Sequence, residues 1–263
     1  MAERPFNATP TPLVVAHRGD PRRHPENSVL GFLAALDAGA DAVELDVRLT
    51  RDGVPVVIHD ATVDRTTDGT GLVRGMTLAE LRRLRLRGGG PVDVVPTLRE
   101  ALDAIAGAGG GVDVEVKNIP GDPDFDGPDE GLLLATLEEL STSSPSDVLV
   151  TSFNPSTLRR CREADGAIAT GLLTIDAVDP MDGLAAASSE GHAFVLPSVR
   201  AIEGRERALA SAAHAAGVRL GAWTADDPAT VSRLASAGLD AIATNDPAMA
   251  AAVVGRAQAA GRP

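Results

Sequence analysis

Two histidines and two carboxylates stand close together in the first quarter of the chain. His17 and His59 bracket a short apolar stretch, VELDV, that carries Glu44 and Asp46. Histidine is the side chain whose unperturbed pKa places proton exchange near neutral pH. Because carboxylates bind hard divalent cations, these four residues together could carry out metal-assisted acid–base hydrolysis.

A second strand-like stretch supplies further charged side chains. Successive residues of a strand face opposite ways, so Glu44 and Asp46 share one face of VELDV, and Asp113, Glu115 and Lys117 share one face of VDVEVK. Ionised groups inside a barrel are costly unless they are paired or bind a metal. The acids therefore predict either a structural ion pair, such as Glu115 with Lys117, or a site for Mg²⁺ or Ca²⁺, which all-oxygen ligands favour.

Arg18 and Lys117 are the candidates for binding an anionic substrate. Arg18 directly follows His17, and its planar guanidinium can bind two phosphate oxygens, which a lysine cannot do. The charges of Glu44, Asp46 and Glu115, of these two basic residues, of one divalent cation and of one phosphodiester cancel. Glu26 and Asn27 are candidates for bracing His17 or Arg18, and Asn27 is also a candidate N-cap for the helix VLGFLAAL.

The other aromatic and histidine residues have less specific signals. Trp223, the only tryptophan, and Phe153 both stand at the ends of predicted strands, where they could form apolar walls of a pocket. His24 lies in a predicted turn and His214 in a predicted surface helix. Together with His192, they are expected to have ordinary structural roles.

The order of the predicted elements indicates how the site residues are brought together. Short aliphatic stretches predict strands at Leu13–His17, Ala42–Val47, Val112–Lys117, Val148–Phe153, Ala169–Leu173, Ala193–Leu196, Arg219–Trp223 and Ala241–Thr244. Helical patterns between them include Ser28–Ala38, Leu98–Ala106, Glu130–Leu140, Pro155–Glu163, Gly204–Ala216 and Pro228–Ala237. Eight strands alternating with helices predict an α/β fold, a closed (β/α)₈ TIM barrel with its active site at the C-terminal ends of the strands. A doubly wound open sheet is the alternative, although no GxGxxG follows the first strand.

One segment, residues 48–90, interrupts the alternation after the second strand. Its first part, RLTRDGVPVVIHD, is typical of a hairpin with Asp52 and Gly53 as the turn. With these two residues central, positions whose numbers add up to 105 pair across the hairpin, so Asp46 is expected opposite His59. The remainder is expected to form a small insertion over the barrel mouth, within a single domain of residues 1–263.

Composition excludes several other classes of function. The 263 residues include 24 Lys and Arg against 37 Asp and Glu, a net charge of −13, and only 2% aromatic residues, which makes nucleic-acid binding improbable. The one cysteine, Cys161, permits no internal disulfide and mildly favours a reducing compartment. The start, MAERPFNATPTP, is unlike a signal peptide, and no apolar stretch reaches the ~18 residues of a membrane span, so a cytoplasmic protein without stable membrane insertion is expected. A homo-oligomer is left open.

The motifs of the chain, taken together, resemble the glycerophosphodiester phosphodiesterase family of phospholipase-C-like barrels. The combination of HRG, ExD and a DG hairpin ending in HD is the specific part of this resemblance. Two positions depart from it, since Ser28 replaces the usual threonine and Asn245 replaces a common aspartate. The matching segments are AHRG at Ala16–Gly19, PEN at Pro25–Asn27, GADAVELDV at Gly39–Val47, TRDGVPVVIHD at Thr50–Asp60, RTTDGTG at Arg65–Gly71, VEVK at Val114–Lys117, TSF at Thr151–Phe153, AWT at Ala222–Thr224 and GLDAIATNDP at Gly238–Pro247.

The resemblance implies a TIM barrel that hydrolyses small-molecule glycerophosphodiesters to sn-glycerol 3-phosphate and an alcohol. It implies that His17 and His59 are the acid–base pair and that Arg18 and Lys117 contact the phosphate. It also implies that a set of acids binds one Ca²⁺ or Mg²⁺ ion; these are Glu44, Asp46 and Glu115.

Two mechanisms and three rival functions follow from this interpretation. One histidine, which we expect to be His17, takes a proton from water or from the substrate's own 2-hydroxyl, and His59 protonates the leaving alcohol. Attack by the 2-hydroxyl would form a cyclic phosphate that water then opens. The rivals are a lysophospholipase D, which would need an apolar groove, a non-catalytic barrel that binds a phosphorylated ligand, and a metal-dependent lyase or aldolase of the same fold.

Overall fold

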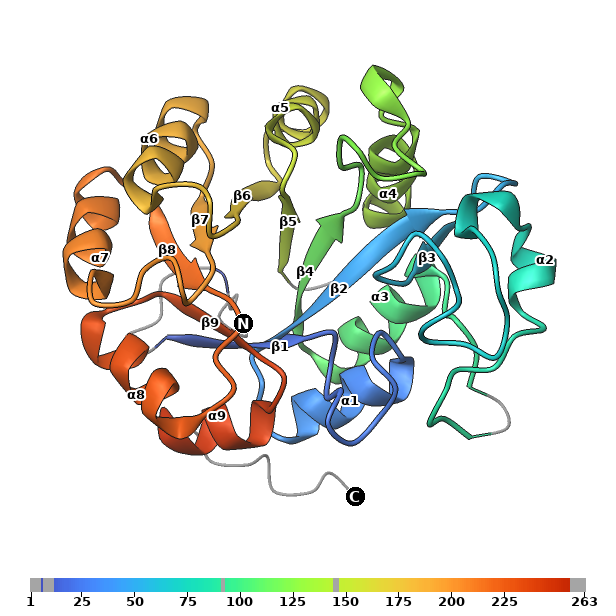
Figure 1. Cartoon of the computed structure of the whole chain (residues 1–263), viewed down its shortest axis with the longest axis horizontal. Helices are drawn as coiled ribbons and strands as arrows, with labels where there is room; N and C mark the ends of the chain where they lie inside the picture. The colour runs from blue at the N-terminus through green and yellow to red at the C-terminus, as the bar shows by residue number, and fades with distance from the viewer. Residues whose placement is uncertain (1–5, 7–11, 91–92, 144–146, 256–263) are drawn as a thin grey trace.

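Eight parallel strands close into a barrel in the described part of the chain. The computed structural model describes residue 6 and residues 12–90, 93–143 and 147–255. Each strand pairs with its neighbours in chain order, and β1 pairs with both β2 and β9, which closes the sheet (Figure 1). This confirms the predicted (β/α)₈ barrel. The strands are β1 Leu13–His17, β2 Ala42–Leu49, β4 Gly111–Val116, β5 Val148–Ser152, β6 Ala169–Thr174, β7 Phe194–Pro197, β8 Arg219–Ala222 and β9 Ala241–Thr244.

Helices follow these strands and cover the outside of the barrel. They are α1 Val29–Asp37, α3 Leu98–Ala108, α4 Gly131–Thr142, α5 Pro155–Ala164, α6 Pro180–Glu190, α7 Glu206–Ala215, α8 Pro228–Ala237 and α9 Pro247–Val253. The expected helices match six of these. Helices α6 and α9 were not among the expected ones. The α6 sequence, PMDGLAAASSE, contains a glycine and two serines, which have low helix propensity. The Asp179 side chain, which accepts a hydrogen bond from the Met181 N–H, caps its start.

The alternation of strand residues places the charged side chains inside the barrel. Val43, Leu45 and Val47 of β2 are fully buried in the core cluster that the strands share with the surrounding helices. Glu44 and Asp46, on the other face of the same strand, therefore point to the interior, as predicted. A second apolar cluster lies inside the barrel, nearer the N-terminal ends of the strands; it includes Leu149, Phe194 and Leu196.

The hairpin after β2 has a different register from the one that the sequence indicates. Strand β3 is Pro55–Val57, and Leu49 pairs with Pro55, so the numbers of paired residues add up to 104 rather than 105. The expected opposition of Asp46 and His59 is therefore wrong: the Asp46 carbonyl accepts a hydrogen bond from the Ile58 N–H, at 2.9 Å. The reason is a three-residue loop, residues 51–53, in which Gly53 adopts a left-handed φ of 80°.

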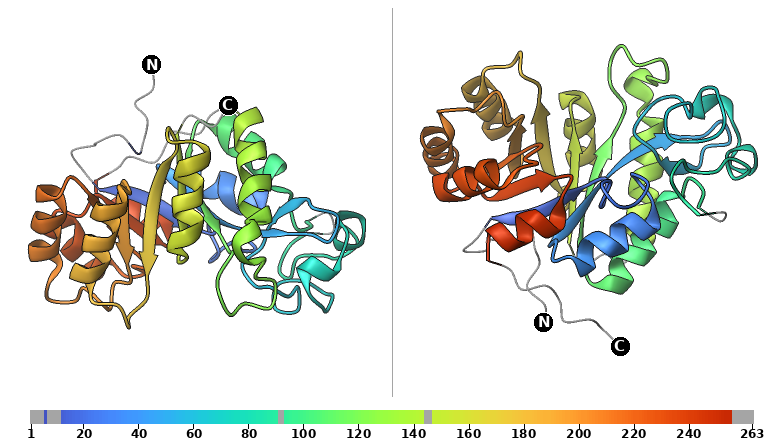
Figure 2. Two further views of the ribbon diagram at one scale, coloured as in Figure 1. Left: turned by 90° about the horizontal axis from the view of Figure 1, so that it is seen from above. Right: turned by 60° about the horizontal axis from the view of Figure 1, so that its bottom comes forward.

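The rest of the insertion forms a small packed unit beside the barrel. It contains a 3₁₀ turn, η1 (Val73–Gly75), and a short helix, α2 (Leu78–Leu81). Its own apolar cluster includes Val63, Val73 and Leu81, and all three side chains are fully buried. Figure 2 shows the unit at one side of the barrel, beyond β2 and α4. None of the described helices combines the length and the apolar character that crossing a membrane requires.

Candidate active site

Three carboxylates converge at the C-terminal ends of two neighbouring strands. Glu44 and Asp46 come from β2 and Glu115 from β4, and the parallel register pairs Asp46 with Glu115. One carboxylate oxygen from each residue lies within 4.8 Å of the others, and all three residues are buried. The structure thus brings together the three residues that the sequence predicts as metal ligands.

Lys117 and Arg18 compensate only part of this negative charge. Lys117 Nζ lies 2.8 Å from Asp46 Oδ1 and 2.6 Å from Glu115 Oε1, so the structural ion pair that the sequence left open is present. Arg18 Nε lies 3.2 Å from Asp46 Oδ2. Burial alone would raise the pKa of Asp46, but Lys117 and Arg18 outweigh it and hold that pKa far below the usual range. The Asp46 carboxylate is therefore ionised.

The negative charge of Glu44 and Glu115 is only partly compensated by the protein, and a bound cation would compensate it. Burial, followed by repulsion from Asp46 and Glu115, raises the pKa of Glu44 well above its usual value. Burial also raises the pKa of Glu115 to about 7. The Oε1 atom of Glu44 is buried and has no hydrogen-bond partner among the described residues. An unpartnered buried carboxylate oxygen in an all-oxygen cluster fits a hard divalent cation.

Glu26 and Asn27 brace the site from the segment between β1 and α1. Glu26 Oε1 accepts a hydrogen bond from Arg18 at 3.1 Å, and Asn27 Nδ2 donates to Asp46 Oδ2 at 2.8 Å. The expected N-cap role of Asn27 is wrong. Ser28 caps α1 instead, since its hydroxyl accepts from the Gly31 N–H, and this leaves the Asn27 amide free to reach across to β2.

His17 is oriented by a residue that the sequence did not assign. Its Nδ1 lies 2.9 Å from Asn245 Oδ1, and Asn245 Nδ2 donates to Asp226 Oδ2 at 2.7 Å. Because a carboxylate can only accept, the amide must present its oxygen to His17, which places the proton on Nδ1 and leaves Nε2 as a base. Burial, followed by repulsion from Arg18, lowers the pKa of His17 to about 4.

His59 is fixed by three residues that also lacked a predicted role. His59 Nδ1 lies 2.7 Å from Asp60 Oδ1, and Arg65 holds Asp60 through both of its carboxylate oxygens, at 2.7 and 3.0 Å. Arg65 also donates two hydrogen bonds to Glu26, at 2.6 and 2.8 Å. The buried Arg48 donates to the His59 carbonyl at 2.7 Å. The one signal in the sequence was that Asp60 directly follows His59.

Phe153 and Trp223 pack against each other where β5 and β8 end. Their rings meet edge to face, with centroids 5.5 Å apart and an interplanar angle of 84°. The Phe153 centroid lies 6.0 Å from Lys117 Nζ, and Trp223 Nε1 donates to the Leu196 carbonyl. Both aromatic residues are half-buried. They lie beside the charged groups, where an apolar wall was expected.

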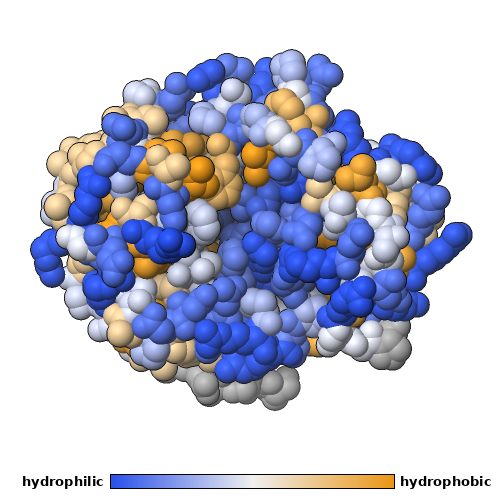
Figure 3. All heavy atoms as spheres, in the orientation of Figure 1, coloured by the Kyte–Doolittle hydropathy of each residue, from blue (hydrophilic) through white to orange (hydrophobic). Residues whose placement is uncertain are grey.

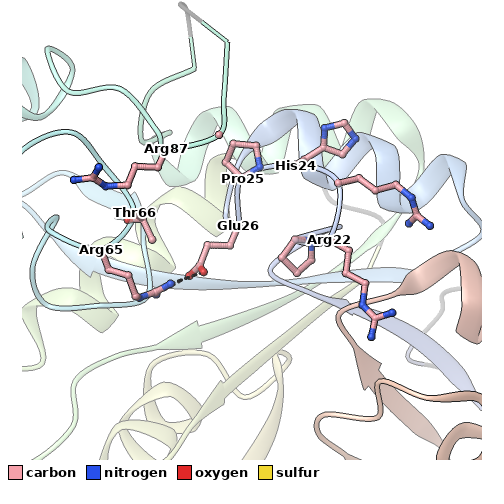
Figure 4. Close-up of a pocket in the computed structure, with 10 residues that line it drawn as sticks. Arg22, His24, Pro25, Glu26, Arg65, Thr66 and Arg87 are labelled. Carbon is pink, nitrogen blue, oxygen red and sulfur yellow. Dashed lines mark hydrogen bonds and ion pairs between the residues drawn. The ribbon is translucent and has the colours of Figure 1, made fainter.

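The remaining histidines contact groups outside this cluster. His192 Nδ1 lies 2.9 Å from the Thr170 hydroxyl, and His214 Nε2 lies 2.9 Å from Asp240 Oδ2. His24 lines an open polar pocket of about 350 Å³ with Glu26, Arg65 and three other arginines. Figure 4 shows that Arg65 turns to Glu26, whereas Arg22 and Arg87 point away from each other. The arginines of this pocket therefore do not converge on one ligand position.

The comparisons with known proteins agree with this geometry. Residues 17–249 match the Glycerophosphoryl diester phosphodiesterase family. A glycerophosphodiester phosphodiesterase of Caldanaerobacter subterraneus is 36% identical over 248 residues, which cover 89% of this chain and 94% of the relative. A phosphodiesterase of Oleispira antarctica, solved in complex with the product sn-glycerol-3-phosphate, superposes with a TM-score of 0.82 at 29% identity and covers 93% of this chain and 97% of its own. A glycerophosphodiester phosphodiesterase of Agrobacterium tumefaciens superposes with a TM-score of 0.74 at 26% identity, over 92% and 99% of the two chains. The chain therefore belongs to the glycerophosphoryl diester phosphodiesterase family and is an enzyme of that activity.

Proposed function

We propose that this enzyme hydrolyses glycerophosphodiesters to sn-glycerol 3-phosphate and an alcohol, with His17 and His59 as the acid–base pair and with one bound divalent cation. The observation that carries the proposal is the cluster of Glu44, Asp46 and Glu115, whose oxygens lie within 4.8 Å of one another beside Arg18 and Lys117. The product found in the Oleispira antarctica phosphodiesterase supports the same small-molecule class of substrate.

The three acids would hold the cation, either Ca²⁺ or Mg²⁺. When bound, the cation neutralises charge that develops on the phosphoryl oxygens. The guanidinium of Arg18 and the ammonium of Lys117 bind the anionic phosphate from the same side of the barrel mouth. Asn27 and Glu26 keep Asp46 and Arg18 in place through the hydrogen bonds described above.

The two histidines differ in the group that holds Nδ1, which is an amide at His17 and a carboxylate at His59. The free Nε2 of the neutral His17 takes a proton from the nucleophile, either water or the substrate's 2-hydroxyl. Burial lowers the pKa of His59, whereas the carboxylates of Asp46 and Asp60 oppose that shift and so favour the protonated ring that would give its proton to the leaving alcohol oxygen. If the 2-hydroxyl attacks, the P–O bond to the alcohol breaks as a cyclic phosphate forms, and water opens that ring in a second step.

The lyase or aldolase alternative conflicts with the state of Lys117. A Schiff-base lysine needs a depressed pKa so that its amine is neutral. Burial lowers the pKa of Lys117, but Asp46 and Glu115 outweigh that effect and raise it to about 12. A non-catalytic barrel is disfavoured because both histidines and all three acids are present and each histidine is held by a hydrogen bond to Nδ1.

The experiment is turnover of glycerophosphocholine, with release of glycerol 3-phosphate as the readout. The metal-stripped protein is expected to be inactive and to recover activity with Ca²⁺ or Mg²⁺. His17→Ala and His59→Ala are each expected to lose most of kcat, and His214→Ala, outside the cluster, is the matched control. Full turnover by either active-site variant would contradict the acid–base roles of the histidines, and full turnover in excess chelator would contradict the need for a cation.

We further propose that residues 1–263 act as one domain and that the enzyme works in the cytoplasm. The single cysteine supports a reducing compartment. The terminal residues of that domain lie outside the described ranges.

A further inference from the structure

An apolar groove opens beside the charged cluster, over the C-terminal end of β6. Its volume is about 590 Å³. Asp182 is the one charged side chain among the described residues that line it. The apolar residues that form most of its wall are Ile119, Phe153, Leu172, Leu173, Ile175 and Val178.

Two of these apolar side chains, together with the neighbouring Met181, are exposed to solvent. Ile175 is 52% exposed, Val178 36% and Met181 44%, and all three lie in one short segment between β6 and the first turn of α6. In Figure 3, hydrophobic side chains gather near α6, beside a hollow that hydrophilic side chains line. A contiguous exposed apolar surface in a soluble domain is typical of a binding surface, because leaving it in water is unfavourable.

Phe153 joins the groove to the proposed reaction centre. Its ring lines the groove and also lies 6.0 Å from the ammonium of Lys117. The barrel mouth is therefore divided. The ends of β1, β2 and β4 carry the proposed cation and phosphate ligands, and the ends of β5, β6 and β8 present Phe153, the groove and Trp223. The charged residues that follow β6 and β8 are engaged with other protein groups: Asp176 pairs with Arg200, and Asp226 accepts from Asn245.

This division matches the two arms of a glycerol phosphodiester. The phosphate and the glycerol hydroxyls need charged and hydrogen-bonding partners, which the cluster at the ends of β1, β2 and β4 offers. The second arm, the alcohol that leaves, then extends over Phe153 into the groove. Resting on the proposed function, we propose that the groove binds the hydrocarbon part of this alcohol, so that the enzyme prefers glycerophosphodiesters of apolar alcohols.

The reaction itself is unchanged by this preference. Water supplies the oxygen that ends on phosphorus, the P–O bond to the alcohol breaks, and the alcohol oxygen receives the proton. Only the binding of the departing group differs. Burial of hydrocarbon stabilises the bound state by about 0.8 kcal/mol per methylene, which corresponds to roughly a threefold to fourfold change in kcat/KM.

A matched series of alkyl esters of sn-glycerol 3-phosphate tests the preference. Methyl, butyl and octyl diesters all release glycerol 3-phosphate, so one assay measures them all, below their micelle concentrations. We expect kcat/KM to rise roughly threefold per methylene from methyl to butyl and to rise further to octyl. A flat series, with every diester turned over, would overturn the groove proposal and leave the proposed function standing. If no diester is turned over with Ca²⁺ or Mg²⁺, the proposed function fails first.

A charged substitution in the groove tests whether the preference for longer alkyl chains arises there. Ile175→Asp is expected to bring the ratio of kcat/KM for the octyl and methyl diesters close to one, and its turnover of the methyl diester reports whether the variant folds. Leu134→Asp is the matched control, because Leu134 is 44% exposed on α4, away from the groove. An unchanged ratio in Ile175→Asp would overturn the proposal.

Two further measurements test whether the groove binds something other than the alcohol arm of the substrate. Lysophosphatidylcholine carries its chain on the glycerol arm; if it were preferred over the octyl diester, the assignment of the groove to the alcohol arm would be overturned. Cosedimentation with phosphatidylcholine vesicles that Ile175→Asp abolishes, together with a flat alkyl series, would assign the exposed residues to a lipid surface instead.

Discussion

At the scale of single residues, Asn245 decides which nitrogen of His17 can act. Its amide is oriented by Asp226, so it can only accept the Nδ1 proton. An amide stabilises an imidazolium less than a carboxylate would, which is consistent with a pKa of about 4 for the buried ring. The departure from the common aspartate thus places an amide instead of a carboxylate beside His17 Nδ1, which bears on the proposed proton transfer.

We expect Asn245→Asp to shift the pH dependence of the enzyme. A carboxylate beside Nδ1 favours the protonated ring, so the pKa of His17 rises, by at most about 1 to 3 units because Asp226 lies next to the same position and opposes a second negative charge there. Because the base must be deprotonated, the acid limb of the kcat/KM profile moves to higher pH. The measurement is the pH profile of both proteins with glycerophosphocholine and a saturating cation, with His214→Gln as the control. An acid limb that stays in place would show that His17 is not the base.

The residues that the sequence identified and those it missed differ in a physical way. The sequence alone identifies the residues with reactive side chains on or near strands, because the strand spacing fixes the face that each one occupies. These are Glu44, Asp46, Glu115 and the two histidines. Asn245, Asp226 and Arg65 act through contacts between distant segments. His17 and Asn245, for example, are 228 positions apart. Alternation within one strand gives no information on such pairs.

At the scale of elements, Arg65 connects two segments that carry opposite halves of the site. It joins Glu26, which supports Arg18 after β1, to Asp60, which supports His59 after β3. The hydrogen bonds of Arg65 lower the pKa of Asp60 to about 2 and keep that carboxylate ionised. The insertion thus contributes a positioning residue to the site as well as His59 itself.

We expect Arg65→Gln to lower kcat by up to about 100-fold, since small displacements of catalytic groups carry penalties of that order. Stability should change little, because the Arg65 side chain is 48% exposed and exposed ion pairs contribute little. The measurements are kcat, KM and the urea midpoint, with Arg159→Gln as the control, an exposed arginine paired with Glu190. Arg65→Lys should recover only part of kcat, since an ammonium cannot bind both acids in the same planar geometry. A fall in kcat that simply follows a fall in stability would contradict a positioning role.

The hairpin register and the N-cap of α1 were predicted wrongly, because both depend on contacts with residues outside the segment itself. Asp52-Gly53 is compatible with both a two-residue and a three-residue loop, and the packing of Val56 and Ile58 into the insertion's own cluster accompanies the second. Asn27 and Ser28 are both residue types that favour N-caps. Asn27 has a left-handed φ of 56° and donates a hydrogen bond to Asp46, whereas Ser28 is extended and caps α1. The barrel was predictable because the pattern of a strand followed by a helix recurs along the chain, so that an error in one element does not change the predicted fold.

At the scale of the whole molecule, the barrel interior holds more acid than its basic residues neutralise. Asp113 is an example that the proposed reaction does not use. It is buried next to the Thr151 hydroxyl, which donates a hydrogen bond to it at 2.7 Å. Burial raises its pKa from an ordinary 3.8 to about 8, so the folded protein keeps a proton that the unfolded chain releases.

This difference predicts how stability depends on pH. Between about pH 4 and 8 the unfolded state binds fewer protons at Asp113 than the folded state, so stability falls as pH rises, by roughly 1 kcal/mol per unit. His17 has the opposite sign, but only between its folded value of about 4 and its ordinary 6.5. Above pH 6.5 the contribution of His17 is absent, and Glu44 and Glu115, whose pKa values are also raised, act with the same sign as Asp113. A comparison of variants in the window from pH 6.5 to 8 therefore isolates the effect of Asp113. We expect Asp113→Asn, which resembles the protonated acid, to show a shallower fall of the urea-derived unfolding free energy across this window. Equal slopes in the two proteins would mean that Asp113 is ionised in the folded barrel at neutral pH.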